Sequence, residues 1–116
     1  MKIGFVGLGQ MGKPIAFNLL KSRAELLVND RSDQWFDAFC ERGARGTTEI
    51  ADLAETDIIF LCLPSANVVQ AVLLGDGGLL PRLNQSQIVV DLSHVYRWPK
   101  GEPSQFGETG AILRNV

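Results

Sequence analysis

The pattern of glycines close to the N-terminus constrains the fold of this chain more than any other feature. We expect a first strand over residues 2–6, of which 3–6 form an apolar run, and Gly7, Gly9 and Gly12 follow it in the spacing G-x-G-x-x-G. In a strand–turn–helix unit the first glycine permits the tight turn, the second lets a phosphate approach the backbone, and the third lets the helix pack against the strand. A helix that begins here also directs free N–H groups toward an anion. The stretch therefore predicts a dinucleotide-binding unit.

The residues that follow the glycines make this interpretation more specific. The bare spacing is weak evidence, because the chain contains 12 glycines and such spacings arise by chance. Apolar residues then recur at helical spacing over 10–22, and a second apolar strand over 25–29 ends at Asp30. A strand, a glycine turn, a helix and a second strand that ends in an acid form the context that dinucleotide binding requires. The alternative is a glycine-rich turn without a ligand.

Strand and helix patterns alternate along the rest of the chain, which favours a parallel sheet with right-handed crossovers. We expect a helix that Ser32 caps and that ends at Gly43. Three aromatic side chains of this helix are expected to face inward: Trp35, Phe36 and Phe39. The apolar run at 57–62 is typical of a central strand that is covered on both faces. The other expected elements are strands at 44–46, 87–91 and 111–114, a helix at 47–54 capped by Thr47 or Thr48, and a helix at 65–74.

Composition limits the kind of protein that this chain can be. The 116 residues, with 46% hydrophobic and 21% charged side chains, suit one globular domain. A net charge of −2 with scattered Lys and Arg gives no electrostatic case for binding nucleic acid or an anionic membrane. No apolar run approaches the ~20 residues of a membrane helix, and we expect no signal peptide. Cys40 and Cys62 lack metal spacing, so we expect buried free thiols, no metal site and a cytoplasmic location.

Two charged residues stand at the tip of the second strand. The Asp30 carboxylate can accept hydrogen bonds from both ribose hydroxyls of an adenosine, and it repels a 2′-phosphate. The neighbouring Arg31 can lie over the adenine or pair with a 2′-phosphate. Asp30 therefore favours NAD, whereas Arg31 keeps NADP open. The plain alternative for Asp30 is a turn residue.

Further candidates follow the later strands, whose carboxyl ends face the ligand crevice of an open α/β sheet. Leu63 and Pro64 follow the central strand, where we expect the nicotinamide ribose or its phosphate side to pass and Asn67 to reach it. The alternative there is a simple turn in which Ser65 caps the next helix. Ser93 and His94 follow the last clear strand, where nicotinamide and substrate would meet. The single histidine can act as an acid or base, or it can be an exposed loop residue.

These motifs together resemble the β-hydroxyacid dehydrogenases, a family that includes 3-hydroxyisobutyrate dehydrogenase, tartronate semialdehyde reductase and, more distantly, 6-phosphogluconate dehydrogenase. The segment GFVGLGQMGKPIAFNLLKS, residues 4–22, is similar to the family's N-terminal signature. The similarity continues through LLVNDRS, TEIADLAETDIIFLCLP and GDGGLLPRLNQSQIVVDLS, and covers most of residues 1–94 in order. The resemblance implies a Rossmann-type α/β fold, a doubly wound and mainly parallel sheet with helices on both faces.

The resemblance also implies a function, namely reversible hydride transfer between NAD or NADP and a small 3-hydroxy acid. Cofactor contacts would fall at the tip Asp30–Arg31, at Leu63–Pro64 and at the position of His94, where the family usually has Thr. They would also fall on the glycine turn: Gly7, Leu8, Gly9, Gln10, Met11 and Gly12. The family often has an Asn one place beyond Asn67, so that contact carries over less directly.

The family's catalytic lysine lies on a helix of a second, all-helical domain that also forms the dimer. Lys100 does not match its place, so we assign no catalytic residue, and we read residues 1–116 as the dinucleotide-binding domain alone. Two functions remain open: the cofactor-binding part of a dehydrogenase whose substrate needs a second domain, or a stand-alone, non-catalytic module that binds or senses NAD(P). The last strand would leave an open sheet edge at 111–114, which favours pairing into a homodimer.

Overall fold

The computed structural model describes residues 1–92 and 112–115, which form one parallel sheet with helices. The strands are β1 (Lys2–Val6), β2 (Glu25–Asn29), β3 (Arg45–Thr47), β4 (Ile58–Leu61), β5 (Ile88–Asp91) and β6 (Ile112–Asn115). The helices are α1 (Gly12–Leu19), α2 (Phe36–Cys40) and α3 (Ala66–Leu74), with two 3-10 helices, η1 (Ile50–Glu55) and η2 (Leu80–Arg82). The first two strands have the bounds that their apolar runs predict, whereas α1 is shorter at both ends than expected.

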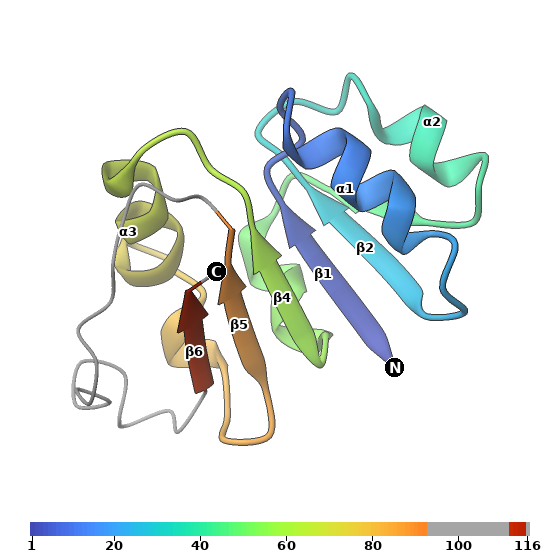
Figure 1. Ribbon diagram of the computed structural model, residues 1–116. Coiled ribbons are helices and arrows are strands. Elements are labelled where there is room, and N and C mark those ends of the chain that lie inside the picture. The colour runs from blue at the N-terminus through green and yellow to red at the C-terminus, as the bar shows by residue number, and fades with distance from the viewer. Residues whose placement is uncertain (93–111, 116) are drawn as a thin grey trace.

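The strands lie in the order β3-β2-β1-β4-β5-β6, and every neighbouring pair is parallel. Figure 1 shows the arrowheads of the labelled strands pointing the same way, so that their carboxyl ends share one edge of the sheet. From β1 the chain proceeds outward to β2 and β3, then returns to β4 and proceeds outward on the other side. This reversal between β1 and β4 is the switch point at which open α/β sheets bind ligands. The predicted doubly wound, Rossmann-type fold is confirmed.

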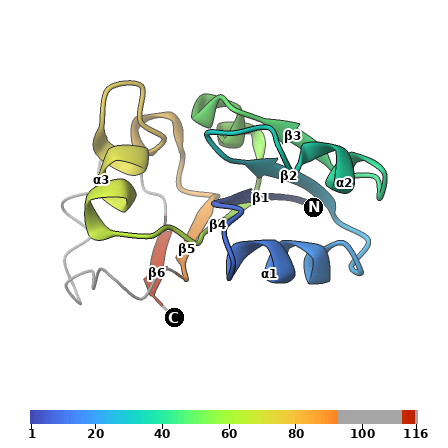
Figure 2. The same ribbon diagram turned by 90° about the horizontal axis from the view of Figure 1, so that it is seen from above.

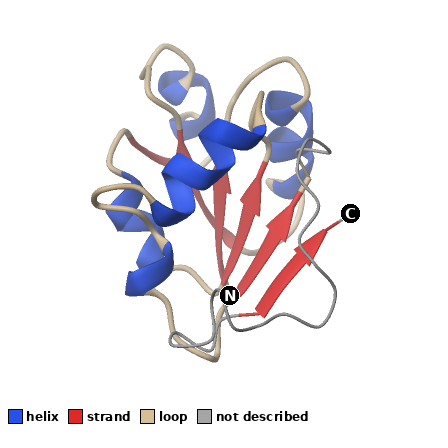
Figure 3. Cartoon of the chain, turned by 90° about the vertical axis from the view of Figure 1, so that its left-hand side faces the viewer, coloured by secondary structure: helices blue, strands red, loops and turns tan. Residues whose placement is uncertain are grey.

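Two apolar clusters hold the helices to opposite faces of the sheet, as Figures 2 and 3 show for α1 and α3. One cluster joins the sheet to α1 and α2, and its most buried members are Phe5, Leu8, Ala16, Val28 and Phe39. The other joins it to η1, α3 and η2, and includes Leu53, Ile59, Leu61, Val69, Leu73 and Leu79. The central strands β1 and β4 are therefore covered on both faces, as the run at 57–62 predicts.

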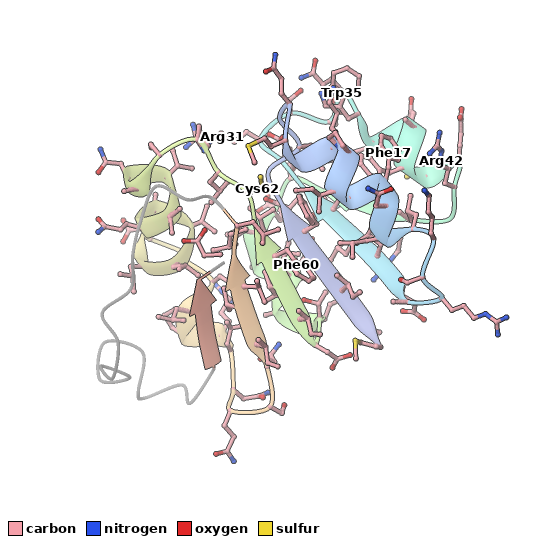
Figure 4. The ribbon with its side chains drawn as sticks, in the orientation of Figure 1. Phe17, Arg31, Trp35, Arg42, Phe60 and Cys62 are labelled. Atoms are coloured by element: carbon pink, nitrogen blue, oxygen red, sulfur yellow. The ribbon has the colours of Figure 1, made fainter. Side chains whose placement is uncertain are left out.

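The aromatic residues around α2 correct one prediction. Phe39 is fully buried and stacks on Phe17 of α1 with ring centroids 4.1 Å apart. Trp35, expected to face inward, is instead 37% exposed, and the Lys13 ammonium lies 3.2 Å from its ring centroid. An indole ring that meets a cation at the surface gains a cation–π contact and needs no place in the core. Figure 4 shows Trp35 at the outer side of α1 and α2.

Three smaller expectations also fail. Ser32 does not cap α2, because its hydroxyl accepts a hydrogen bond from the N–H of Gln34 before the helix begins at Phe36. The threonines 47 and 48 do not cap η1, whose N-cap is Glu49 without a side-chain bond. Cys40, expected to be buried, is exposed. The Ser65 cap is confirmed, since its hydroxyl accepts a hydrogen bond from the N–H of Val68 at 3.2 Å.

The last strand, β6, lies at one edge of the sheet beside β5. Homodimer formation through this edge stays a prediction. Over residues 1–92 and 112–115, the structure contains no helix with the length and apolar character that crossing a bilayer demands.

Candidate functional site

A cleft of about 530 Å³ opens at the carboxyl ends of β1, β2 and β4. Its lining residues fall into two groups, which we call the polar wall and the apolar wall. The polar wall consists of the glycine turn, residues 7–12, and the β2 tip, residues 29–31. The apolar wall consists of Leu63, Val68, Val72 and Leu92. Val6, Cys62 and Pro64 complete the lining. The cleft therefore lies at the switch point of the sheet.

The three motif glycines have three different surroundings. Gly7 has φ +101°, and a Cβ on it would collide with the carbonyl oxygen of Cys62. A Cβ on Gly12 would collide with the carbonyl oxygen of Gly7 and lie 3.2 Å from the ring of Phe5. A Cβ on Gly9 would meet no atom within 4 Å, so this position leaves open space beside the backbone. The geometry matches the tight turn, the close helix packing and the open approach that the spacing predicts.

Backbone N–H groups of the glycine turn divide into two sets. The N–H of Gly7 donates to the Asn29 carbonyl at 2.9 Å, and the N–H of Leu8 donates to Asp30 Oδ2 at 2.9 Å. The N–H groups of Gly9, Gln10 and Met11 donate no hydrogen bond to any acceptor among residues 1–92. Donors at the start of a helix without an internal partner suit a phosphate. Together with the open space at Gly9, they fit the pyrophosphate of a dinucleotide.

The structure brings ten of the predicted site residues to the cleft, the whole glycine turn together with Asp30, Arg31, Leu63 and Pro64. Figure 4 shows Arg31 toward the end of the sheet at which the strands finish. Asn67 is exposed on the first turn of α3 and does not line the cleft. Ser93 and His94 lie outside the described residues. Within the described ranges, no three His, Cys, Asp or Glu side chains gather in a way that could hold a metal ion.

Sequence reasoning missed several lining residues: Val6, Asn29, Cys62, Val68, Val72 and Leu92. Val68 and Val72 stand four positions apart, the spacing of one helix face, and both are half-buried. That spacing signals an apolar face, but the same spacing also occurs where a helix packs on a sheet. The signal could therefore have identified the face without showing that it borders a cleft.

Cys62 was expected to be buried, and the structure places it half-buried on the cleft lining. Burial raises the pKa of the Cys62 thiol, and the nearby Asp91 carboxylate raises it further because a second negative charge is unfavourable there. The thiol is therefore protonated at neutral pH. Figure 4 shows Cys62 just beyond the end of β4.

Comparison with known proteins agrees with this geometry. A family model of the NAD binding domain of 6-phosphogluconate dehydrogenase matches residues 2–99. The chain belongs to this family. It is an NAD(P)-binding domain of the hydroxyacid dehydrogenase type, as its motifs predicted. A structural relative with a similar fold is Psf3, solved in complex with NADP+ and 2-OPP. It is 33% identical, with a TM-score of 0.80 over 96% of this chain and 40% of that chain.

Two curated relatives differ in the names that they carry. The 2-(hydroxymethyl)glutarate dehydrogenase of Eubacterium barkeri is 40% identical over 96 residues, which are 82% of this chain and 32% of the relative. The cytokine-like nuclear factor N-PAC of Pongo abelii is 38% identical over 95 residues, 81% of this chain and 17% of the relative. This NAD(P)-binding domain thus spans a third or less of the length of these curated relatives.

Proposed function

We propose that this NAD(P)-binding domain holds the cofactor's pyrophosphate on the N–H groups of Gly9, Gln10 and Met11, with the adenosine over the β2 tip. The observation that carries the proposal is the set of turn donors that have no hydrogen-bond partner among residues 1–92, beside the open space at Gly9. The helix dipole of α1 adds to the attraction for a negative group. The nicotinamide half then extends across the switch point toward the apolar wall.

The charge at the β2 tip supports NAD over NADP. The Asp30 carboxylate lies beside the glycine turn and accepts a hydrogen bond from the N–H of Leu8. With the adenosine over the β2 tip, as proposed, a 2′-phosphate would bring its negative charge close to this carboxylate. Repulsion between the two disfavours NADP, whereas the 2′-hydroxyl of NAD can donate to the carboxylate. Arg31 is exposed beside it and offsets part of that repulsion. We therefore expect a preference for NAD that is moderate in size.

Titration of NADH and NADPH against wild type and Asp30→Ala tests this assignment. The ratio of the two dissociation constants is the readout, because a general loss of turn geometry weakens both cofactors alike. We expect wild type to bind NADH more tightly than NADPH. The dissociation constant for NADPH divided by that for NADH should then fall about tenfold in the variant, the equivalent of one lost charge-dependent contact. An unchanged ratio would refute the role of Asp30 in cofactor choice.

We further propose that the domain serves an oxidoreductase that acts on a small 3-hydroxy acid. The cofactor, when bound, supplies the hydride chemistry, while the residues of the cleft bind it, orient it and exclude water. Proton transfer at the substrate hydroxyl requires a positioned acid–base group, and we assign none in this chain. We therefore expect no turnover when the isolated chain is mixed with NADH and 3-oxo acids and absorbance is followed. Turnover would overturn this division of roles.

A second candidate function is a stand-alone module that binds or senses NAD(P) without catalysis. The similarity to a protein named as a nuclear factor favours it, because the same kind of domain occurs there under a name that is not a dehydrogenase. The discriminating observation is a neighbouring reading frame that encodes a helical companion. Mixing that companion with this chain, NADH and a small 3-oxo acid should produce NADH oxidation, with reduction of the oxo group to a hydroxyl, if the domain serves an enzyme, and no oxidation if it is a sensor.

A further inference from the structure

The glycine turn is attached to the β2 tip by side-chain as well as backbone bonds. Asp30 Oδ2 accepts a hydrogen bond from the N–H of Leu8 at 2.9 Å, across 22 residues of sequence. Its other oxygen, Oδ1, accepts from the N–H of Arg31 at 2.6 Å. The first bond is partly buried, so water replaces it poorly when it is lost. A single carboxylate thus joins the tip of β2 to the turn that follows β1.

The bond between Leu8 and Asp30 determines which N–H groups of the turn remain available to a ligand. Leu8 is 1% exposed, and its N–H already donates to the Asp30 carboxylate. The three following N–H groups, those of residues 9–11, have no acceptor in the described part of the chain. If Leu8 were released, its donor would have to find another partner and the turn could rotate. The carboxylate is therefore one of the groups that hold the turn, together with the backbone bonds from Gly7 to Asn29 and from Lys13 to Gly9.

We propose that Asp30 is a positioning residue that fixes the glycine turn in the cofactor-free domain, in addition to the ribose contact proposed above. The inference rests on the proposed function in one respect, namely that the turn donors serve the pyrophosphate. A carboxylate has about four lone-pair directions. The two backbone bonds use two of them, which leaves two for the ribose hydroxyls. The same side chain can therefore hold the turn and accept the ribose at once.

Two neutral variants separate the positioning role from the charge. Asp30→Asn keeps one side-chain oxygen that can accept from Leu8, whereas Asp30→Ala keeps none. Asp33→Ala is the matched control, because it removes an exposed carboxylate from the same loop without touching the cleft. Amide hydrogen exchange at Leu8, measured by NMR on the full chain without cofactor, reports the bond directly. We expect about tenfold faster exchange in Asp30→Ala, and near wild-type exchange in the other two.

The second measurement uses inorganic pyrophosphate as the probe, because it has no ribose that could contact Asp30. If the carboxylate positions the turn, Asp30→Ala binds pyrophosphate about fivefold more weakly than Asp30→Asn, although both have lost the same charge. Equal Leu8 exchange in wild type and both Asp30 variants, or equal pyrophosphate binding by the two variants, would overturn the inference. If wild type binds neither NADH nor pyrophosphate, the proposed function fails, and the exchange comparison still decides whether Asp30 holds the turn.

Discussion

The two walls of the cleft are built in different ways. The polar wall is made of two short backbone segments, the glycine turn and the β2 tip. Hydrogen bonds join them, from the N–H of Gly7 to the Asn29 carbonyl and from the N–H of Leu8 to the Asp30 carboxylate. The apolar wall is made of side chains from α3 and the loops after β4 and β5. The first depends on having no side chain at a few positions, and the second depends on which side chains are present. Substitutions should therefore affect the polar wall through backbone geometry and the apolar wall through contact area.

The largest effect is expected where the polar wall meets the core. In Gly12→Ala, the added Cβ collides with the carbonyl oxygen of Gly7, so the turn or the helix must move. We expect the free energy of unfolding to fall by about 2–3 kcal/mol, which urea denaturation measures. Gly9→Ala is the control, with a change within about 0.5 kcal/mol, because its Cβ meets no atom. Equal stability of the two variants would show that the turn is less tightly packed than described.

Gly9→Ala also tests whether the cofactor approaches the polar wall at this position. Its Cβ enters the open space beside the turn donors, where the pyrophosphate must approach. We expect NADH to bind about tenfold more weakly while stability stays the same. Isothermal titration of wild type and variant measures the change. An affinity equal to wild type would mean that the phosphates do not pass this position.

The two cysteines test where the cleft lies, because only one of them lines it. Cys40 is exposed on α2, whereas Cys62 is half-buried on the cleft lining. Alkylation requires the thiolate, and the raised pKa of Cys62 leaves less of it as thiolate at a given pH. At neutral pH, Cys62 should therefore react more slowly than the exposed Cys40. The rate at Cys62 should increase as the pH rises. Saturating NADH should slow Cys62 about fivefold and leave Cys40 unchanged. Mass spectrometry of iodoacetamide-treated protein follows both sites, and equal protection of both would contradict the placement of the cleft.

The smallest effect is expected on the apolar wall. Val72→Ala removes two methyl groups from a half-buried side chain, so NADH should bind about threefold more weakly. ADP-ribose, which lacks the nicotinamide, should bind as before. Leu74→Ala on the same helix is the control, because Leu74 is exposed and does not line the cleft. If ADP-ribose weakens as much as NADH, the nicotinamide does not lie against this wall.

The contrast between the walls also explains what the sequence could predict. The polar wall follows from local rules, since the glycine spacing and the acid at the β2 tip each act through backbone geometry nearby. The bounds of β1 and β2 follow from their apolar runs in the same way. Together these features predicted the glycine turn, Asp30 and Arg31, which are eight of the lining residues. Leu63 and Pro64 were predicted from the end of the central strand, and the fold from the alternation of strands and helices along the chain.

Three of the failures have a different origin, because they depend on how side chains of separate elements pack against one another. Whether Val68 faces the core or a cleft depends on how α3 sits against β4. Trp35 lies outside the core because Lys13 comes over its ring, a contact between α1 and the loop before α2. Cys62 was expected in the core because an apolar strand ends there, but the loop after β4 leaves it half exposed. Such contacts are set by tertiary packing, which periodicity does not contain.

The central claim is that the turn donors of residues 9–11 hold the cofactor. Titration of NADH into the isotopically labelled chain, followed by amide NMR shifts, tests it most directly. We predict saturable binding with the largest shifts at Gly9, Gln10 and Met11, and small shifts along β3 and η2. Absence of saturable binding, or shifts that leave the glycine turn unaffected, would contradict the account.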